Sequence, residues 1–176
     1  MPGGVVDGYG PRIALWLLGP GMTTLAALGG ALLPRLAPRR FDVSAFESTY
    51  YYVCCVTVGM LAYVYALVLL AVLQGGVAMH RAIPAGVFIL LVLVGNPLGK
   101  VKRNFFIGVR TPWTLADESV WYATHRLAAR LMVASGLLGL FALWLGAPHW
   151  VLLAITLAWV PLAVGYSLLL YKRLPH

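Results

Sequence analysis

The stretch that decides the fold is TYYYVCCVTVGMLAYVYALVLLAVL, residues 49–73, which carries no charged side chain. A bilayer core about 30 Å thick is crossed by a helix of about 20 apolar residues. The run is continuously apolar rather than alternating, and lipid requires backbone groups to be paired within the spanning element. A transmembrane helix is therefore predicted, and a barrel strand is not.

Four further runs of the same kind occupy residues 13–33, 83–98, 127–147 and 150–171, and Arg130 is the one charged residue inside them. Together the five runs cover most of the chain. We therefore predict an all-α fold, a polytopic transmembrane helical bundle of about five spans, forming a single membrane domain over residues 1–176.

Composition excludes the other broad classes. Of the 176 residues, 61% are apolar and 10% are charged, whereas soluble domains average about 45–50% and about 25%. A chain this short cannot bury that much apolar surface in a water-soluble core. Disordered chains are poor in apolar residues, so disorder is excluded as well.

The positions of the charges behind the net charge of +8 indicate how the chain is oriented in the membrane. With the N-terminus outside and the C-terminus inside, eleven of the 13 Lys and Arg residues lie on the cytoplasmic side, and only Arg12 and Arg81 lie outside. The positive-inside rule therefore predicts an N-out, C-in orientation. The same distribution explains the basic excess through anionic lipid headgroups, so no direct nucleic-acid partner is expected.

Two local patterns inside the spans predict helix geometry. Gly19-Pro20-Gly21 interrupts the first span and predicts a kink there, as does Pro161 in the last span, because each proline lacks a backbone donor. Small residues recur at four-residue spacing, which favours close helix contacts. These pairs are Ala26 with Gly30, Ala27 with Ala31, and Ser135 with Gly139.

One connecting segment differs from the others. Residues 96–126 read NPLGKVKRNFFIGVRTPWTLADESVWYATHR and mix cations, amides, hydroxyls and aromatics. Gly108 predicts a tight turn, and Thr114 followed by Asp117 predicts a capping box that starts a helix at about Leu115. In that helix Trp121 and His125 share one face.

This segment resembles the SdpI family of bacterial membrane proteins. The resemblance rests on the string NFFIGVRTPWTL at residues 104–115, on Trp121, and on Thr124-His125-Arg126. It extends upstream to Leu33-Pro34, to Pro38-Arg39-Arg40, and to the aromatic residues 46–52. Longer family members begin with an additional helix bearing a Pro-x-His motif, which this sequence does not show, so a short form with five spans is expected.

The resemblance implies a non-enzymatic binding protein of the bacterial cytoplasmic (inner) membrane. Family properties suggest immunity to a membrane-active toxic peptide, or signalling through a bound cytoplasmic repressor. Membrane lipids and further copies of the chain are the other expected partners. The candidate binding residues are Asn96, Lys102, Asn104, Gly108, Arg110, Thr111, Pro112, Trp113, Thr114, Trp121, His125 and Arg126.

Other interpretations stay open at this stage. The segment is equally consistent with a structural loop folded against helix ends, and the chain with a structural subunit of a larger complex. A small transporter would line a path with Asn96, Thr57, Thr156 or Ser167, and a membrane enzyme acting on lipid-linked substrates would use Glu118 and His125.

The sequence also argues against several kinds of site. All five acidic residues lie outside the apolar runs, which disfavours an ion-coupled carrier. The sequence contains no Cys/His group with metal-ligand spacing and no phosphate-binding glycine loop, so neither a metal nor a cofactor is expected.

Overall fold

The structure, a computed structural model, describes residues 10–36, 44–104 and 106–174. This part of the chain is 83% helical and contains no strand. Residues 38–40 of the upstream resemblance, Asp7 and Asp42 lie outside the described residues.

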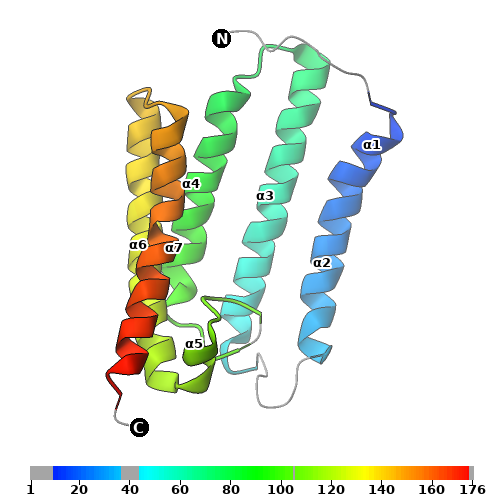
Figure 1. The fold of residues 1–176 in the computed structure, drawn as a ribbon. Helices are drawn as coiled ribbons and strands as arrows, with labels where there is room; N and C mark the ends of the chain where they lie inside the picture. The colour runs from blue at the N-terminus through cyan, green and yellow to red at the C-terminus, as the bar shows by residue number, and fades with distance from the viewer. Residues whose placement is uncertain (1–9, 37–43, 105, 175–176) are drawn as a thin grey trace.

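Five helical segments are long and apolar enough to cross a membrane, as predicted (Figure 1). The first, Ile13–Leu36, comprises α1 (Ile13–Trp16), a π-helical turn (Leu17–Gly21), α2 (Met22–Leu32) and a 3₁₀ turn (Leu33–Leu36). A 3₁₀ turn (Ser44–Phe46) leads into α3 (Glu47–Gln74), which is followed by α4 (Met79–Leu98). The remaining helices are the short α5 (Pro112–Ala116), then α6 (Glu118–Trp144) and α7 (His149–Lys172).

At Gly19-Pro20-Gly21, where the sequence predicts a kink, the structure has a π-helical turn. Proline donates no backbone hydrogen bond, so the helix widens locally instead of breaking. The Thr23 hydroxyl donates to the Gly19 carbonyl oxygen at 2.9 Å, which satisfies a backbone group at the turn. Gly19 itself is buried against the Tyr65 ring, where a larger residue has no room.

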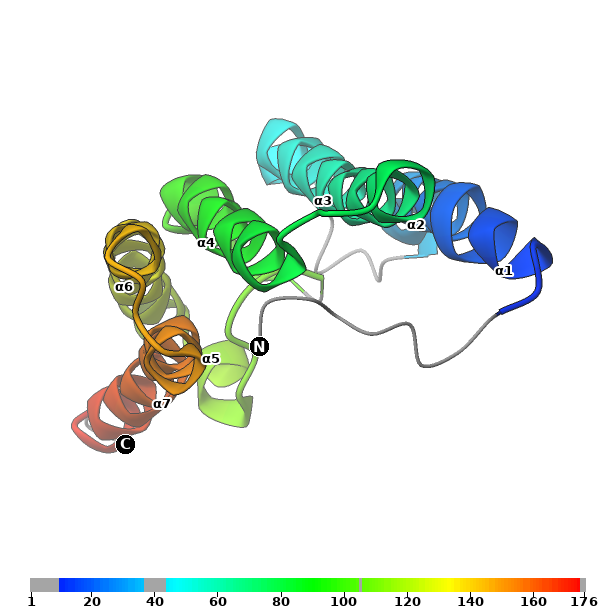
Figure 2. The same ribbon diagram turned by 90° about the horizontal axis from the view of Figure 1, so that it is seen from above.

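The long helices form an open row rather than a closed bundle (Figure 2). Contacts run from α2 to α3, from α3 to α4, from α4 to α6 and from α6 to α7, and α5 packs on α6 and α7. α1 and α2 contact no other long helix than α3, and α3 in turn contacts α4. The tightest part of the molecule is therefore the α4–α6–α7 unit.

Small residues let α4 and α6 approach closely, as the spacing of Ser135 and Gly139 predicted. The Phe88 ring is fully buried against Gly139, and its carbonyl lies beside Gly136. At the other contact the Tyr50 hydroxyl donates to the Gly30 carbonyl oxygen at 2.9 Å, which ties α3 to α2. Helix association gains little from the hydrophobic effect in lipid, so close backbone packing and one buried hydrogen bond stabilise these contacts instead.

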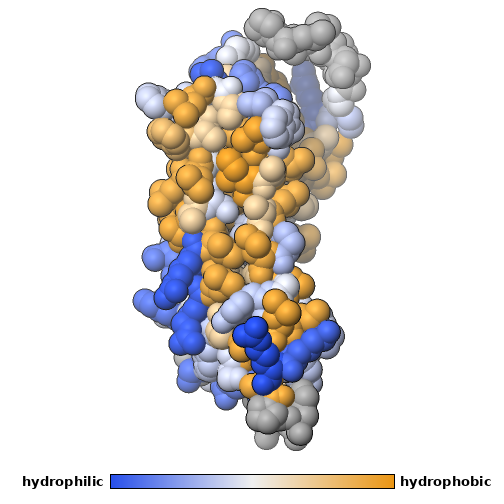
Figure 3. All heavy atoms as spheres, turned by 60° about the vertical axis from the view of Figure 1, so that its left-hand side comes forward, coloured by the Kyte–Doolittle hydropathy of each residue, from blue (hydrophilic) through white to orange (hydrophobic). Residues whose placement is uncertain are grey.

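Hydrophobic and hydrophilic residues are distributed unevenly along the length of the helices. On the face seen in Figure 3, hydrophobic residues cover the middle part, and hydrophilic residues lie at both ends, with the more extended group towards the lower end. That lower end carries the α4–α6 connection, the start of α6 and the end of α7 (Figure 1). Arg12 and Arg81 precede or begin helices at the opposite end.

We expect Gly136→Ala to destabilise the protein by about 1–3 kcal/mol, because a Cβ there would lie 2.6 Å from the Phe88 carbonyl oxygen. Gly165→Ala in α7 is the matched control, since nothing lies within 4 Å of a Cβ at that position. It should be neutral or stabilising by up to about 1 kcal/mol. Reversible unfolding in mixed detergent micelles measures both changes, and equal effects would contradict the close α4–α6 contact.

Candidate functional site

The candidate site is the α4–α6 connection, residues 99–117, which lies at the lower end of the molecule in Figure 1. It leaves α4 after Leu98, forms α5, and enters α6 at Glu118. It lies against the ends of the tightly packed helices, and α5 touches both α6 and α7.

Asn104 organises the first half of the connection. Its side chain is fully buried. The carboxamide oxygen Oδ1 accepts from the backbone N–H groups of Phe106 and Ile107, both at 2.7 Å. The amide Nδ2 donates to the carbonyl oxygens of Lys102 at 2.7 Å and Ile107 at 3.2 Å. One side chain therefore supplies the hydrogen bonds that a turn without helical pairing would otherwise lack.

Trp121 and His125 anchor the connection to α6. Both are fully buried, and their rings stack with centroids 3.9 Å apart. Trp121 Nε1 donates to the Val101 carbonyl oxygen at 2.9 Å. His125 Nε2 accepts from the Val109 N–H at 3.0 Å, and Nδ1 lies 2.7 Å from the Trp121 carbonyl oxygen.

These contacts define the protonation state of the imidazole. A carbonyl oxygen only accepts, so Nδ1 carries the proton, and Nε2 must be unprotonated to accept from Val109. His125 is thus held neutral, with both ring nitrogens bonded to backbone groups. Gly108 lies over the ring edge with φ of 120°, and a Cβ there would overlap Nε2.

Threonine hydroxyls build α5, and here the predicted capping box was wrong. The N-cap is Thr111, whose side chain accepts from the Thr114 N–H, and Pro112 follows at the first helical position. Thr114 Oγ1 accepts from the Thr111 N–H at 2.9 Å and lies 2.9 Å from the Val109 carbonyl oxygen. Asp117 belongs to the next helix instead.

Asp117 separates α5 from α6 because its backbone is extended. Its carboxylate accepts from the backbone N–H groups of Ser119 and Val120 and caps the new helix. The Ser119 hydroxyl bond, together with these backbone bonds, lowers the pKa of the Asp117 carboxyl. This helix continues into the fourth span, since α6 runs unbroken from Glu118 to Trp144.

Two further contacts clamp the connection, and the sequence did not reveal them. Trp113 Nε1 donates to Ser167 Oγ on α7 at 2.7 Å, and Ser167 in turn donates to the Val164 carbonyl oxygen. Arg103 donates to the Leu115 carbonyl oxygen at 3.0 Å, near the end of α5. For the contact with Trp113, the sequence signal was Ser167, a lone serine in an apolar run. Such a serine indicates a polar contact but does not identify its partner.

The structure divides the predicted binding residues into two sets. Four are buried and hold the connection together, two are half-buried, and six are exposed. The buried ones are Asn104, Thr114, Trp121 and His125, the half-buried ones Thr111 and Trp113, and the exposed ones Asn96, Lys102, Gly108, Arg110, Pro112 and Arg126. A ligand that meets this surface therefore meets the exposed set.

Thr57 and Thr156 of the transporter alternative lie apart, and Glu118 and His125 of the enzyme alternative differ in exposure. Thr57 lies on α3 and Thr156 on α7, two helices that share no contact, and both hydroxyls donate to carbonyls of their own helices. Glu118 is exposed and lies 3.4 Å from the Tyr122 hydroxyl, whereas His125 is enclosed. Among the described residues, no group of three His, Cys, Asp or Glu side chains could hold a metal ion.

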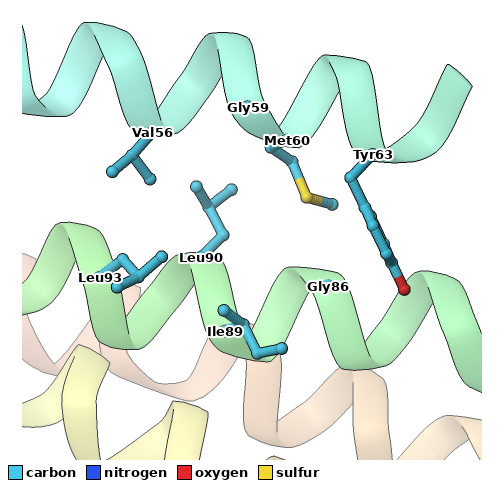
Figure 4. Close-up of a pocket in the computed structure, with 8 residues that line it drawn as sticks. All are labelled: Val56, Gly59, Met60, Tyr63, Gly86, Ile89, Leu90 and Leu93. Atoms are coloured by element: carbon cyan, nitrogen blue, oxygen red, sulfur yellow. The ribbon is translucent and has the colours of Figure 1, made fainter. Parts of the chain in front are cut away.

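An apolar pocket of about 270 Å³ opens between α3 and α4 (Figure 4). Residues of both helices line it, and the Tyr63 hydroxyl points towards α4, where it donates to the Ala82 carbonyl oxygen at 2.8 Å. Its lining residues are Val56, Gly59, Met60, Tyr63, Gly86, Ile89, Leu90 and Leu93. With its one hydroxyl already engaged, the pocket offers packing for a hydrocarbon group.

Thr124 is fully buried on α6, and its hydroxyl has no hydrogen-bond partner among the described residues. A buried unpaired hydroxyl carries a desolvation cost. We expect Thr124→Val to raise the free energy of unfolding by up to about 1 kcal/mol, measured in detergent micelles. Thr114→Val, which removes a paired hydroxyl, is the control and should destabilise. A loss of stability in Thr124→Val would show that its hydroxyl is satisfied.

The fold and the site define a multi-pass membrane protein with a folded, internally bonded connection at one end. Part of the chain is similar to the SdpI family. Residues 100–167, which include most of the connection and run into α7, match the model of the SdpI/YfhL protein family.

A curated relative is the "Immunity protein SdpI" of Bacillus subtilis (strain 168), which is 34% identical over 91 residues. The alignment covers 51% of this chain and 44% of that protein, so the chain spans less than half of the relative's length. No solved structure matches the chain significantly.

Proposed function

We propose that this protein confers immunity to a membrane-active toxic peptide by binding it. It does so in the bacterial cytoplasmic membrane, with the N-terminus outside and the connection on the cytoplasmic side. The cation distribution supports this orientation, because the described Lys and Arg residues other than Arg12 and Arg81 belong to one end of the row of helices.

The similarity to an immunity protein carries the proposal, together with where the family match falls. The family match covers the connection, α6 and most of α7, and it leaves out the apolar pocket between α3 and α4. The matched region is thus the part in which backbone and side-chain hydrogen bonds hold a non-helical segment in one shape. Such rigidity lowers the entropic cost of binding.

Within the connection, the exposed charged side chains of Lys102 and Arg110 adjoin the buried framework in sequence. The Asn104 turn follows directly after Lys102, and Arg110 directly precedes the Thr111 cap. We assign peptide contact to these two cations. Asn104 and His125 act indirectly, by fixing the backbone that carries them.

A protection assay tests the proposal. The chain is expressed in a sensitive bacterial host, which is then exposed to a panel of secreted membrane-active peptides, with survival and membrane abundance both measured. We expect the wild type to protect against at least one peptide, and Lys102→Ala/Arg110→Ala to lose protection at unchanged abundance. Arg12→Ala/Arg81→Ala, at the opposite end, is the charge-matched control. Failure of the wild type to protect against any peptide would remove the immunity function.

A second candidate function is retention of a cytoplasmic repressor at the membrane, favoured by the clustering of cations at the same end. Membrane pelleting of the host's soluble DNA-binding proteins, with and without the chain, measures it. Association that is lost in Lys102→Ala/Arg110→Ala supports signalling. Equal pelleting in the absence of the chain argues against it.

A further inference from the structure

Two arginines on α6 lie in a groove that the connection does not use. Arg126 and Arg130 are one helical turn apart, and both are exposed. With Ala123 and Leu127 of α6 and Tyr166 of α7 they line a groove of about 370 Å³. The groove therefore combines two guanidinium groups and a phenol with an apolar wall.

Within the described part of the chain, no acidic side chain pairs with these arginines. Neither they nor Tyr166 make a hydrogen bond or ion pair with any residue that the structure describes. Of the described acids, Glu118 is bonded to Tyr122 and Asp117 to the start of α6. Glu47 begins α3, which does not touch α6 or α7.

The position of Arg126 and Arg130 along α6 places them beside the lipid headgroups. The exposed Trp144 and Trp150 mark one membrane boundary, because tryptophans concentrate at interfaces. Counting back along α6 from Trp144, a core of about 30 Å ends after about 20 residues, close to Arg126. Arg130 then lies about one turn inside, from where its long side chain reaches the headgroup level.

We propose that the α6–α7 groove binds an anionic phospholipid through its phosphate. Arg126 and Arg130 pair with the phosphate oxygens, Tyr166 donates from the facing helix, and Leu127 contacts the acyl chains. Arginine suits this role because its planar fork can donate two hydrogen bonds to one phosphate. The site lies at the headgroup level whichever way the protein is oriented, and it does not depend on the immunity function.

Lipid retention tests the proposal. Wild-type protein is reconstituted in phosphatidylcholine vesicles containing phosphatidylglycerol, extracted, and analysed by native mass spectrometry for bound lipid. We expect one phosphatidylglycerol to be retained selectively, and Arg126→Gln/Arg130→Gln to weaken that binding roughly tenfold or more. Lys172→Gln/Arg173→Gln, at the end of α7, removes the same charge elsewhere and should retain the lipid.

Two further arms separate the alternatives. Arg126→Lys/Arg130→Lys keeps both charges and should keep most of the preference, which distinguishes charge recognition from a general loss of structure. Inorganic phosphate is added alone as a competitor. If phosphate replaces the lipid and stays bound, the groove is a free-anion site and the lipid assignment is wrong. Equal retention by the wild type and Arg126→Gln/Arg130→Gln also overturns the proposal.

Discussion

Replacing Trp121 with alanine is expected to lower the free energy of unfolding by about 3–5 kcal/mol, the range found for removal of a buried tryptophan. The ring is fully buried and stacked on His125, and its Nε1 bonds the Val101 carbonyl oxygen in the connection. The substitution therefore removes packing and leaves a buried carbonyl without its donor. Reversible unfolding in mixed detergent micelles measures the loss.

Trp121→Phe separates the two contributions. Phenylalanine keeps an aromatic ring against His125 but cannot donate to Val101, so a smaller loss of about 1–3 kcal/mol is expected. Trp150→Ala is the control for removing a tryptophan as such, because that side chain is 73% exposed. If Trp121→Ala destabilises no more than Trp150→Ala, the anchoring role of Trp121 is wrong.

Gly108→Ala is expected to destabilise the connection by about 2–4 kcal/mol. An alanine must adopt the φ of 120° that the turn requires, and its Cβ would overlap His125 Nε2. The turn can relax only by moving Val109 away, which leaves its N–H without the imidazole. Faster amide hydrogen exchange at residues 107–111, compared with the wild type, would report this movement.

Gly146→Ala is the matched control for backbone strain alone. Gly146 also has a positive φ, of 75°, but nothing lies within 4 Å of a Cβ there. About 1 kcal/mol or somewhat more is expected from the left-handed conformation itself. The difference between the two variants measures the contact with His125, and the absence of any difference would mean that the imidazole does not fill the space under Gly108.

The sequence predicts the spans well because length and apolarity are local properties that lipid enforces directly. The prediction of the capping box was wrong because it also used only a local pattern. Thr114 and Asp117 fit a capping box, but Thr111 with Pro112 offers a start three residues earlier. The helix that starts there also carries a contact with a distant part of the fold, from Trp113 Nε1 to Ser167 on α7.

The burial of Asn104 and His125 was beyond a sequence-based prediction. Polar side chains are exposed by default, and both of these are enclosed because their partners are backbone groups of a segment without regular structure. The course of such a segment is set by the helices around it. Composition identified the connection as unusual, but not which of its side chains face inward.

The bond between Trp113 and Ser167 has a consequence for biosynthesis. The two residues are separated by 54 positions, and Ser167 lies near the end of the last helix. While the chain is being made, the indole N–H has no partner until that helix has emerged and inserted. The connection therefore closes only after α7 has been made, and a nascent chain that stops before Ser167 carries all of the motif residues without the contact that fastens them to α7.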